Sequence, residues 1–352
     1  MTKWKRIKLN EFKFPKVTDY NKEYLSYGQL PQGVELNKIN KTNNNLIIEN
    51  LNNNITGVGD EFTSHVMANY NTGISLYIPK STNIEDPIKL EFNMDDENPT
   101  TIDQNIIIAS ANSESTIIFD YTSKDENNFH NGVTKVYAKK NSVVNIIKIQ
   151  RMDDKSYNFD SNIAYIEGRA VVNWISVEIG SDISGSNFTS ILEDEASEGN
   201  LASIYLGNGT RKMDLEYTMI HKGRRSISNI ETRGVLMDQA TKVFRGNLDF
   251  KKGAKLSKGV EEEFVVLLDP TVKSHSIPAL LCEEDDVQGE HAASAGQIND
   301  NQLFYLMSRG LDIREAKQLI IQASFRPILD KIPMDDLRDL ILEEIDRRLL
   351  NG

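Results

Sequence analysis

The chain has 352 residues, with 40 lysine and arginine residues against 52 aspartate and glutamate residues, and a formal net charge of −12. This acidic balance argues against nucleic acid as the main partner, because binding to phosphate requires a positive face. No run approaches the roughly 20 apolar residues of a membrane-spanning helix, so no membrane partner is expected. The basic N-terminus has no apolar stretch behind it, so no secretory signal is predicted. A single cysteine, Cys282, excludes an internal disulfide and fits a reducing cytoplasm.

Residues 1–45 are predicted to form a short, irregular N-terminal arm. Pro15 and Pro31 interrupt any helical pattern in this segment. Two asparagine-rich stretches, at 40–45 and 52–54, are typical of solvated loops.

Residues 46–298 are predicted to form the core, built from many short strands. Three consecutive units show the pattern: Asn112–Phe119, Lys139–Ile147 and Glu167–Ile175. Each unit opens with polar residues, passes a small residue and enters a β-branched run. The small residues Ser115, Ser142 and Ala170 recur with a period of roughly 27 to 28, which is typical of stacked repeats.

This repeat favours a right-handed parallel β-helix, and the fold class is expected to be mainly β. A sandwich or barrel stays open as an alternative, although hairpin turns of the Asn-Gly type are few. Later segments such as Asn200–Tyr205 and Glu263–Leu268 keep the strand-like texture but lose the period. A coil of strands leaves open ends, and unpaired strand edges invite association, so the architecture also predicts a partner.

Residues 299–352 are predicted to form a small helical domain. Asn299 or Asp300 can cap a first helix that Gly310 stops. Asp312 can cap a second helix, which Pro327 is expected to end. A third helix follows Pro333, with an apolar stripe on one side and a charged face that includes Arg348 on the other.

The common catalytic motifs are absent: the sequence has no P-loop, nucleophile elbow, His-Glu-x-x-His or Cys-x-x-Cys. The chain is therefore not expected to be an enzyme. The strongest local candidate for chemistry is Cys282–His291, which places a thiol, an imidazole and several carboxylates in ten residues. From the residues alone, Cys282 is expected to be a small buried hydrophobe. His291 stays open between a structural hydrogen bond and a functional role.

The run Asp285–Ile298 resembles the signature of the SufB/SufD family of iron–sulfur cluster assembly proteins. Gln302–Leu311 is similar to the family's helical tail, and Val243–Gly246 to one of its shorter upstream motifs. The form Asp-Asp-Val-x-Gly-x-His-Ala is closest to the SufD branch. The stretch Gly259–Phe264 contains no cysteine, whereas SufB carries a cysteine on a late core strand.

The resemblance implies a parallel β-helix with a helical C-terminal domain, acting as a scaffold in the SUF pathway. It implies pairing with SufB and docking of the SufC ATPase, with a homodimer when the chain is isolated. His291 matches a histidine thought to contribute a ligand, so a transient iron–sulfur cluster or iron is expected at the SufB interface, with no tightly bound cofactor. The residues expected to dock SufC are Phe304, Tyr305, Arg309, Gly310 and Leu311.

Two other functions remain as alternatives. Many parallel β-helices act on polysaccharides, and carboxylates on an outer face could then serve as acid and base. A SufB-like scaffold that acts as a homodimer is the other alternative, because one β-helix edge is complementary to a similar edge.

Overall fold

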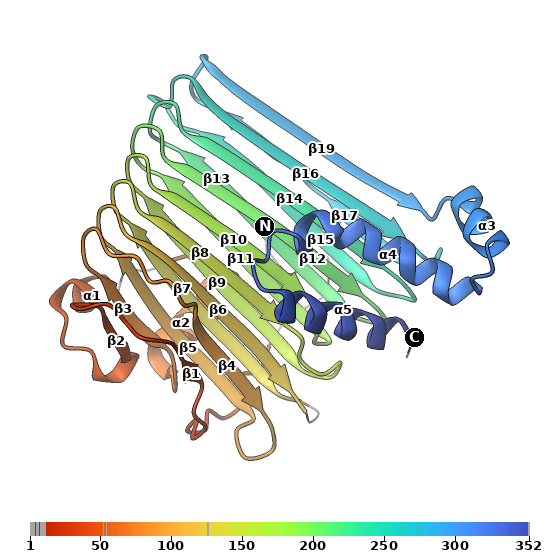
Figure 1. Ribbon diagram of the computed structural model, residues 1–352, viewed down its shortest axis with the longest axis horizontal. Helices are drawn as coiled ribbons and strands as arrows, with labels where there is room; N and C mark the ends of the chain where they lie inside the picture. Colours follow the sequence, from red (N-terminus) through yellow and green to blue (C-terminus); the bar gives the residue numbers. More distant parts are fainter. Residues whose placement is uncertain are drawn as a thin grey trace.

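The computed structural model describes Trp4, Ile7 and residues 12–51, 53, 55–124 and 127–350. Within these residues the chain winds into a parallel β-solenoid (Figure 1). Each coil contributes one strand to each of two facing sheets. In spatial order, sheet A contains β1 (Leu25–Ser26), β4 (Ile88–Met94), β6 (Glu114–Ser123), β8 (Val143–Gln150), β10 (Val171–Glu178), β12 (Glu198–Gly207), β14 (Ile227–Leu236), β16 (Ser257–Leu267) and β19 (Val287–Gln297). The mainly β, parallel fold predicted from the repeat is confirmed.

Sheet B faces sheet A, and its strand order begins at the C-terminal end of the solenoid. Its order is β17 (Lys273–Ser276), β15 (Thr241–Phe250), β13 (Lys212–His221), β11 (Ile183–Leu192), β9 (Tyr157–Ile166), β7 (Phe129–Ala138), β5 (Thr100–Ala109), β3 (Ile74–Ile78) and β2 (Glu35–Lys38). A further strand, β18 (Ala279–Cys282), pairs with β15 beside β17. Among the described strands, only the short β1 and β2 pair antiparallel with their neighbours.

A small buried residue lies at the corner where each sheet A strand from β6 to β16 begins. The residues are Ser113, Ser142, Ala170, Ser197, Ser226 and Ser257, each at most 2% exposed. The residue before each corner has a positive φ between 54° and 63°, although none of the six is glycine. The first corner is therefore Ser113, not Ser115, which lies inside β6. The period also continues to β16, contrary to the prediction that it is lost.

The space between the two sheets is apolar in one part and polar in another. Along β10, Val172 and Trp174 are buried among apolar side chains, whereas Glu178 is buried against the hydroxyl groups of Ser184 and Ser186. Ionisable side chains pair nearby: His130 with Asp103 at 2.7 Å, and Lys148 with Asp160 at 2.8 Å. Polar side chains in this part fix the alignment of the coils through specific partners.

At the N-terminal end, two helices that the sequence analysis does not predict lie against the solenoid. They are α1 (Asn45–Leu51) and α2 (Asp60–Asn69), preceded by a 3-10 turn at Ile39–Lys41. Phe62 of α2 is fully buried, stacks on Phe159 with ring centroids 4.0 Å apart, and also contacts Phe12 and Phe14. The irregular N-terminal segment and α2 together cover part of the outer face of sheet B with an aromatic cluster.

Three C-terminal helices follow the last strand: α3 (Asp300–Ser308), α4 (Ile313–Leu329) and α5 (Asp335–Leu350). The predicted caps are confirmed, because the side chain of Asn299 accepts hydrogen bonds at the start of α3 and Asp312 forms a capping box with Glu315. The prediction that Pro327 ends the second helix is wrong, since α4 continues to Leu329. Pro327 lies in the last turn, so the helix ends two residues after it.

Helices α4 and α5 pack on the outer face of sheet A (Figure 1). Ile321, Phe325, Ile341 and Ile345 join the outward isoleucines of β8, β10 and β12 in one apolar cluster. The prediction that Arg348 belongs to a charged, solvated face is wrong, because its side chain is 2% exposed. Its guanidinium pairs with Glu344 and with Asp154 of the β8–β9 loop. Among the described residues, no helix is both long and apolar enough to cross a membrane.

Candidate partner-docking and cluster-assembly site

The C-terminal end of the solenoid presents strand edges. In the part of the chain that the structure describes, β19 pairs only with β16, while β17 and β18 pair only with β15. Residues 290–297 of β19 are exposed along their whole length, and Leu281 of β18 is 53% exposed. A strand edge with unpaired N–H and C=O groups is a template for another chain.

His291 lies on this open edge. It is paired in register with Glu261 of β16, so the two side chains leave the sheet on the same face, toward the space between the sheets. The imidazole is exposed and forms no hydrogen bond or ion pair with another described residue. Neither nitrogen is therefore committed to a structural contact within the chain, and both can serve as metal ligands.

The coil next to β19, which carries His291, contains a buried ion pair. Lys242 of β15 and Glu263 of β16 are both 0% exposed, with Nζ and Oε1 2.6 Å apart. Tyr205 donates its hydroxyl to the same carboxylate at 2.9 Å, and Ser276 donates to the other oxygen. Burial lowers the pKa of Lys242, and Glu263 opposes that shift. All polar atoms of the Glu263 carboxylate are thus occupied.

Glu261 has no such partners. It is 1% exposed, and neither carboxylate oxygen has a hydrogen-bond donor among the described residues. Burial, assisted by the nearby charge of Glu263, raises the pKa of Glu261 to about 7. The sequence does not predict this site, because Glu261 is one of three consecutive glutamates, a residue type that is usually exposed to solvent.

Cys282 is exposed, so the prediction of a buried hydrophobe is wrong. It ends β18, the outermost strand of sheet B, and therefore has no coil above it to bury it. His291 lies in sheet A, so the two residues of the Cys282–His291 segment belong to different sheets. Among the described residues no group of three or more His, Cys, Asp and Glu side chains could hold a metal ion.

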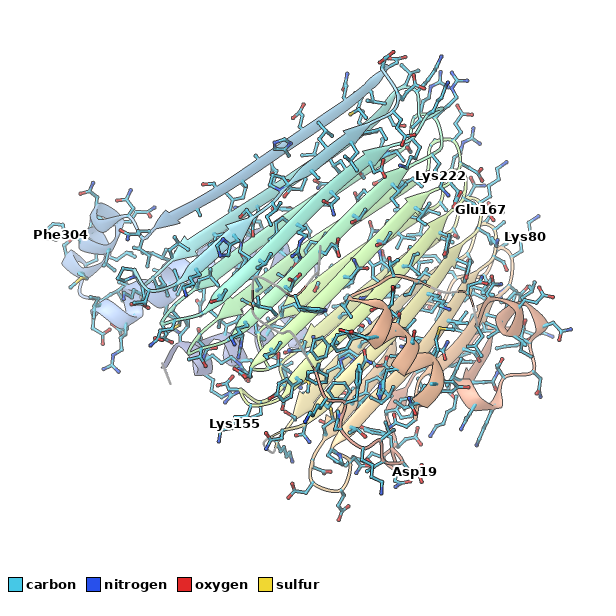
Figure 2. All side chains as sticks on the ribbon, turned by 180° about the vertical axis from the view of Figure 1, so that it is seen from behind. Asp19, Lys80, Lys155, Glu167, Lys222 and Phe304 are labelled. Carbon is cyan, nitrogen blue, oxygen red and sulfur yellow. The ribbon has the colours of Figure 1, made fainter. Side chains whose placement is uncertain are left out.

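Helix α3 follows the C-terminal tip of β19 and lies away from the two sheets (Figure 1), and Figure 2 places Phe304 at this outer corner of the molecule. Phe304 is 74% exposed and Tyr305 56% exposed, and the guanidinium of Arg309 lies over the Tyr305 ring at 5.3 Å. Gly310, with φ of 101°, ends the helix, and Leu311 is partly buried after it. The residues predicted to dock a partner thus lie together on one exposed turn.

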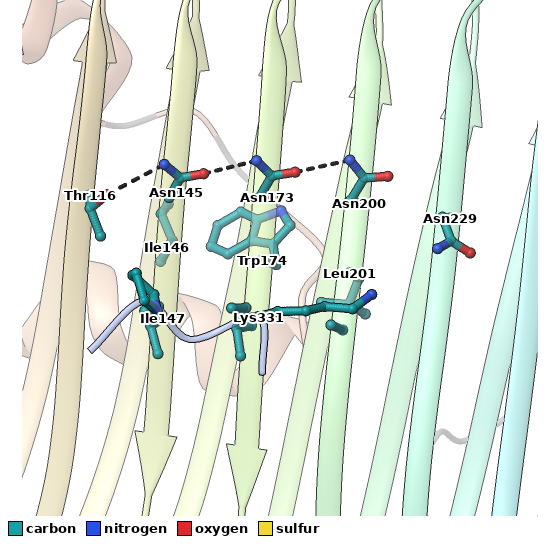
Figure 3. Close-up of a pocket in the computed structure, with 13 residues that line it drawn as sticks. Thr116, Asn145, Ile146, Ile147, Asn173, Trp174, Asn200, Leu201, Asn229 and Lys331 are labelled. Carbon is teal, nitrogen blue, oxygen red and sulfur yellow. Dashed lines mark hydrogen bonds between the residues drawn. The ribbon is translucent and has the colours of Figure 1, made fainter. Parts of the chain in front are cut away.

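A cavity of about 470 Å³ lies elsewhere, between the outer face of sheet A and the loop at Lys331–Pro333 (Figure 3). Its wall is a ladder in which Asn200 donates to Asn173, Asn173 to Asn145, and Asn145 to Thr116. The repeated asparagine within the strand units is the sequence signal for this ladder, and the sequence analysis did not use it. Lys331, at the other wall, pairs with Glu231 at 2.8 Å.

The fold and this end of the molecule define a parallel β-solenoid protein with a C-terminal helical domain and an open strand edge. The chain matches the family model described as SUF system FeS cluster assembly, SufBD core domain, over residues 92–324. It therefore belongs to the SufB/SufD family of iron–sulfur cluster assembly proteins, as the resemblance in Asp285–Ile298 implied.

Individual relatives agree with the family match. The chain is 25% identical to the iron–sulfur cluster assembly protein SufD of Bacillus subtilis over 282 residues, which are 79% of this chain and 64% of that protein. It is 27% identical to an iron–sulfur cluster assembly SufBD family protein of Mycobacterium leprae over 262 residues, 74% of this chain and 30% of that protein. SufB of Bacillus subtilis is 26% identical over 278 residues, 78% of this chain and 60% of that protein. The chain thus spans less than two thirds of each of these relatives.

Proposed function

We propose that this chain is a SufD-type scaffold subunit of a SUF iron–sulfur cluster assembly complex. In this role it pairs with a SufB-type chain and docks a SufC-type ATPase in the cytoplasm. The observation that carries the proposal is the family match over residues 92–324, combined with the unpaired β19 edge. The chain itself supplies position and ligands, not a catalytic centre.

The open C-terminal end supports pairing with a second β-solenoid. A partner strand laid along β19 would satisfy its free backbone groups, and the exposed Leu280 and Leu281 would be covered at the same time. In the absence of SufB, a second copy of the chain can use the same edge and form a homodimer.

Helix α3 supports docking of the ATPase. Large aromatic side chains and arginine are enriched among the residues that dominate binding energy at interfaces, and α3 exposes Phe304, Tyr305 and Arg309 on one turn. Phe304→Ala is expected to weaken binding to SufC by about 2 kcal/mol, or roughly thirtyfold, without changing the thermal stability of the chain. Isothermal titration of SufC into the two proteins measures the difference.

His291 supports a role in handling the cargo. Its exposed imidazole at the pairing edge can reach a nascent cluster, or iron, held between two chains. The cluster is then cargo that leaves the scaffold, not a resident cofactor.

Co-expression with the cognate SufB and SufC, followed by purification through a tag on this chain alone, tests the proposal. All three proteins are expected to elute together, and anaerobic reconstitution is expected to yield an iron–sulfur absorption spectrum. His291→Ala should assemble the same complex and build much less cluster, while Gln288→Ala on the same strand serves as the control.

If no complex forms, the scaffold proposal is wrong. If the complex forms and His291→Ala builds as much cluster as the wild type, the scaffold stands and His291 has no role as a ligand.

A further inference from the structure

Two carboxylates on β16 have opposite surroundings, although only one residue separates them. Glu263 is held by Lys242, Tyr205 and Ser276. Glu261 is equally buried, yet neither of its oxygens has a donor among the described residues. A buried carboxylate without a donor is strongly unfavourable when it is charged, so such a group calls for a partner outside the chain.

The backbone around Glu261 leaves room for its side chain. Gly246 of β15 faces it across the space between the sheets, and a Cβ atom at position 246 would lie 2.6 Å from Cδ of Glu261. Any larger residue at 246 would displace the carboxylate. The glycine therefore permits the position that the carboxylate occupies.

The direction in which a partner can reach Glu261 is set by the end of the solenoid. The next residue in register is His291 on β19, and adjacent strands lie roughly 4.8 Å apart. No described strand continues beyond β19. The carboxylate is thus one strand below an exposed imidazole that is itself uncommitted.

The missing partner must carry positive charge. Lys242 of the facing strand β15 is already paired with Glu263 at 2.6 Å, and it also donates to Ser276. A carboxylate and an imidazole together form the oxygen and nitrogen donor set that first-row divalent ions such as Fe²⁺ accept.

We propose that Glu261 and His291 form one half of a site for a divalent transition-metal ion of the Fe²⁺ class. Two donors do not fill the coordination of such an ion, and the described residues contain no group of three or more ligating side chains. The site is completed by ligands from the chain that pairs along β19. That the ion is the cargo of cluster assembly rests on the proposed function; the binding of the ion by these two residues does not.

Metal binding to the full chain alone tests the site. Purified, metal-free protein is titrated with Co²⁺ under anaerobic conditions and followed by its visible absorption, and Fe²⁺ binding is measured by equilibrium dialysis. Glu261→Gln and His291→Ala are each expected to weaken binding by roughly tenfold or more. Glu262→Gln, at the neighbouring position on the opposite face, is the matched control and should bind like the wild type.

Thermal unfolding separates a ligand from a structural residue. Without metal, Glu261→Gln is expected to melt at a higher temperature than the wild type, because a neutral amide replaces an unpartnered carboxylate. Added Co²⁺ should raise the melting temperature of the wild type and, at the same concentration, raise that of Glu261→Gln by a smaller amount.

The proposal is overturned if Glu261→Gln binds metal like the wild type, or if this variant lowers the stability of the metal-free chain. It is also overturned if no metal binds and Glu261→Gln only weakens pairing with the SufB-type chain, because the carboxylate then receives a cation from that chain. Metal binding by the isolated protein does not depend on co-purification with SufB and SufC, so failure of the scaffold proposal gives a different result.

Discussion

At the N-terminal end of the solenoid, the outermost strands are two short antiparallel segments, β1 and β2, and the rings of Tyr20 and Tyr24 pack on Phe92 of β4 beside them. At the C-terminal end, the outermost strand β19 is 11 residues long, parallel and exposed from residue 290 onward. Short edge strands limit association with other chains. The edge of β19 is long, and no described strand pairs with it on its outer side.

This difference shows how one repeated architecture can be stable alone and incomplete at the same time. The coils from β5 to β16 bury their interior against neighbours on both sides, and at the N-terminal end Tyr24, Leu25 and Leu36 of the chain itself pack against the first coil. The C-terminal end holds an unpartnered carboxylate, an exposed imidazole and exposed leucines. Stability and interaction are therefore located at opposite ends.

The largest effect is expected where the N-terminal part of the chain covers the outer face of sheet B. Phe62→Ala removes the fully buried ring that stacks on Phe159, and we expect it to lower the free energy of unfolding by about 3 to 5 kcal/mol. Leu281→Ala at the open end should change it by less than about 0.5 kcal/mol, because that side chain is 53% exposed. Urea unfolding of both variants measures the contrast, and similar losses would contradict it.

The next effect is on pairing, not on stability. Ala295 lies in register with Val265, so a partner strand on β19 would enclose it between the sheets. Ala295→Lys leaves an ammonium in solvent in the free chain but buries it without a counter-ion in the pair. We expect affinity for the SufB-type chain to fall about a hundredfold, or about 2.7 kcal/mol. Sedimentation or titration calorimetry measures it.

Ser294→Lys is the control for this prediction. Ser294 is in register with the exposed Phe264, so its side chain points away from the space between the sheets. Little change in affinity is expected. Equal losses in both variants would mean that the partner covers β19 in another way.

Most of the fold can be predicted from the sequence. β-branched runs after polar turns predicted the strands, and capping residues predicted where α3 and α4 begin, because these signals are local. The sequence does not reveal that the period continues after Ala170, because the residues before the later corners, such as Arg225 and Leu256, adopt a left-handed conformation that the stack imposes and that their residue types do not predict. Helices α1 and α2 also depend on tertiary packing against the solenoid.

The candidate site was predicted less completely. His291 was found through its motif, and its exposure on an open edge agrees with an available ligand without testing that role. Glu261 gave no signal, because its lack of donors arises from the register of β15, β16 and β19 and from the space above Gly246. The exposure of Cys282 follows from the end of the stack, which local sequence does not encode.

The smallest effect concerns pH and a carboxylate inside the closed part of the solenoid. Burial raises the pKa of Glu178 to about 7 from an ordinary value of 4.5, although Ser184 and Ser186 donate hydrogen bonds to it. The folded chain therefore binds more protons than the unfolded chain between these values. The stabilising contribution is complete below about pH 4.5 and is lost as pH rises through about 7.

Glu178→Gln should accordingly be more stable than the wild type at pH 8, by roughly 2 kcal/mol, and no more stable at pH 4. Urea unfolding of both proteins at the two pH values measures the difference. The nearby charged groups, Asp160 and His130, are common to both proteins, so their titration largely cancels in the comparison. A difference in stability that is independent of pH would show that the folded chain holds Glu178 as an anion with sufficient partners. Glu261 would then be the clearer case of a carboxylate that the chain itself leaves without hydrogen-bond donors.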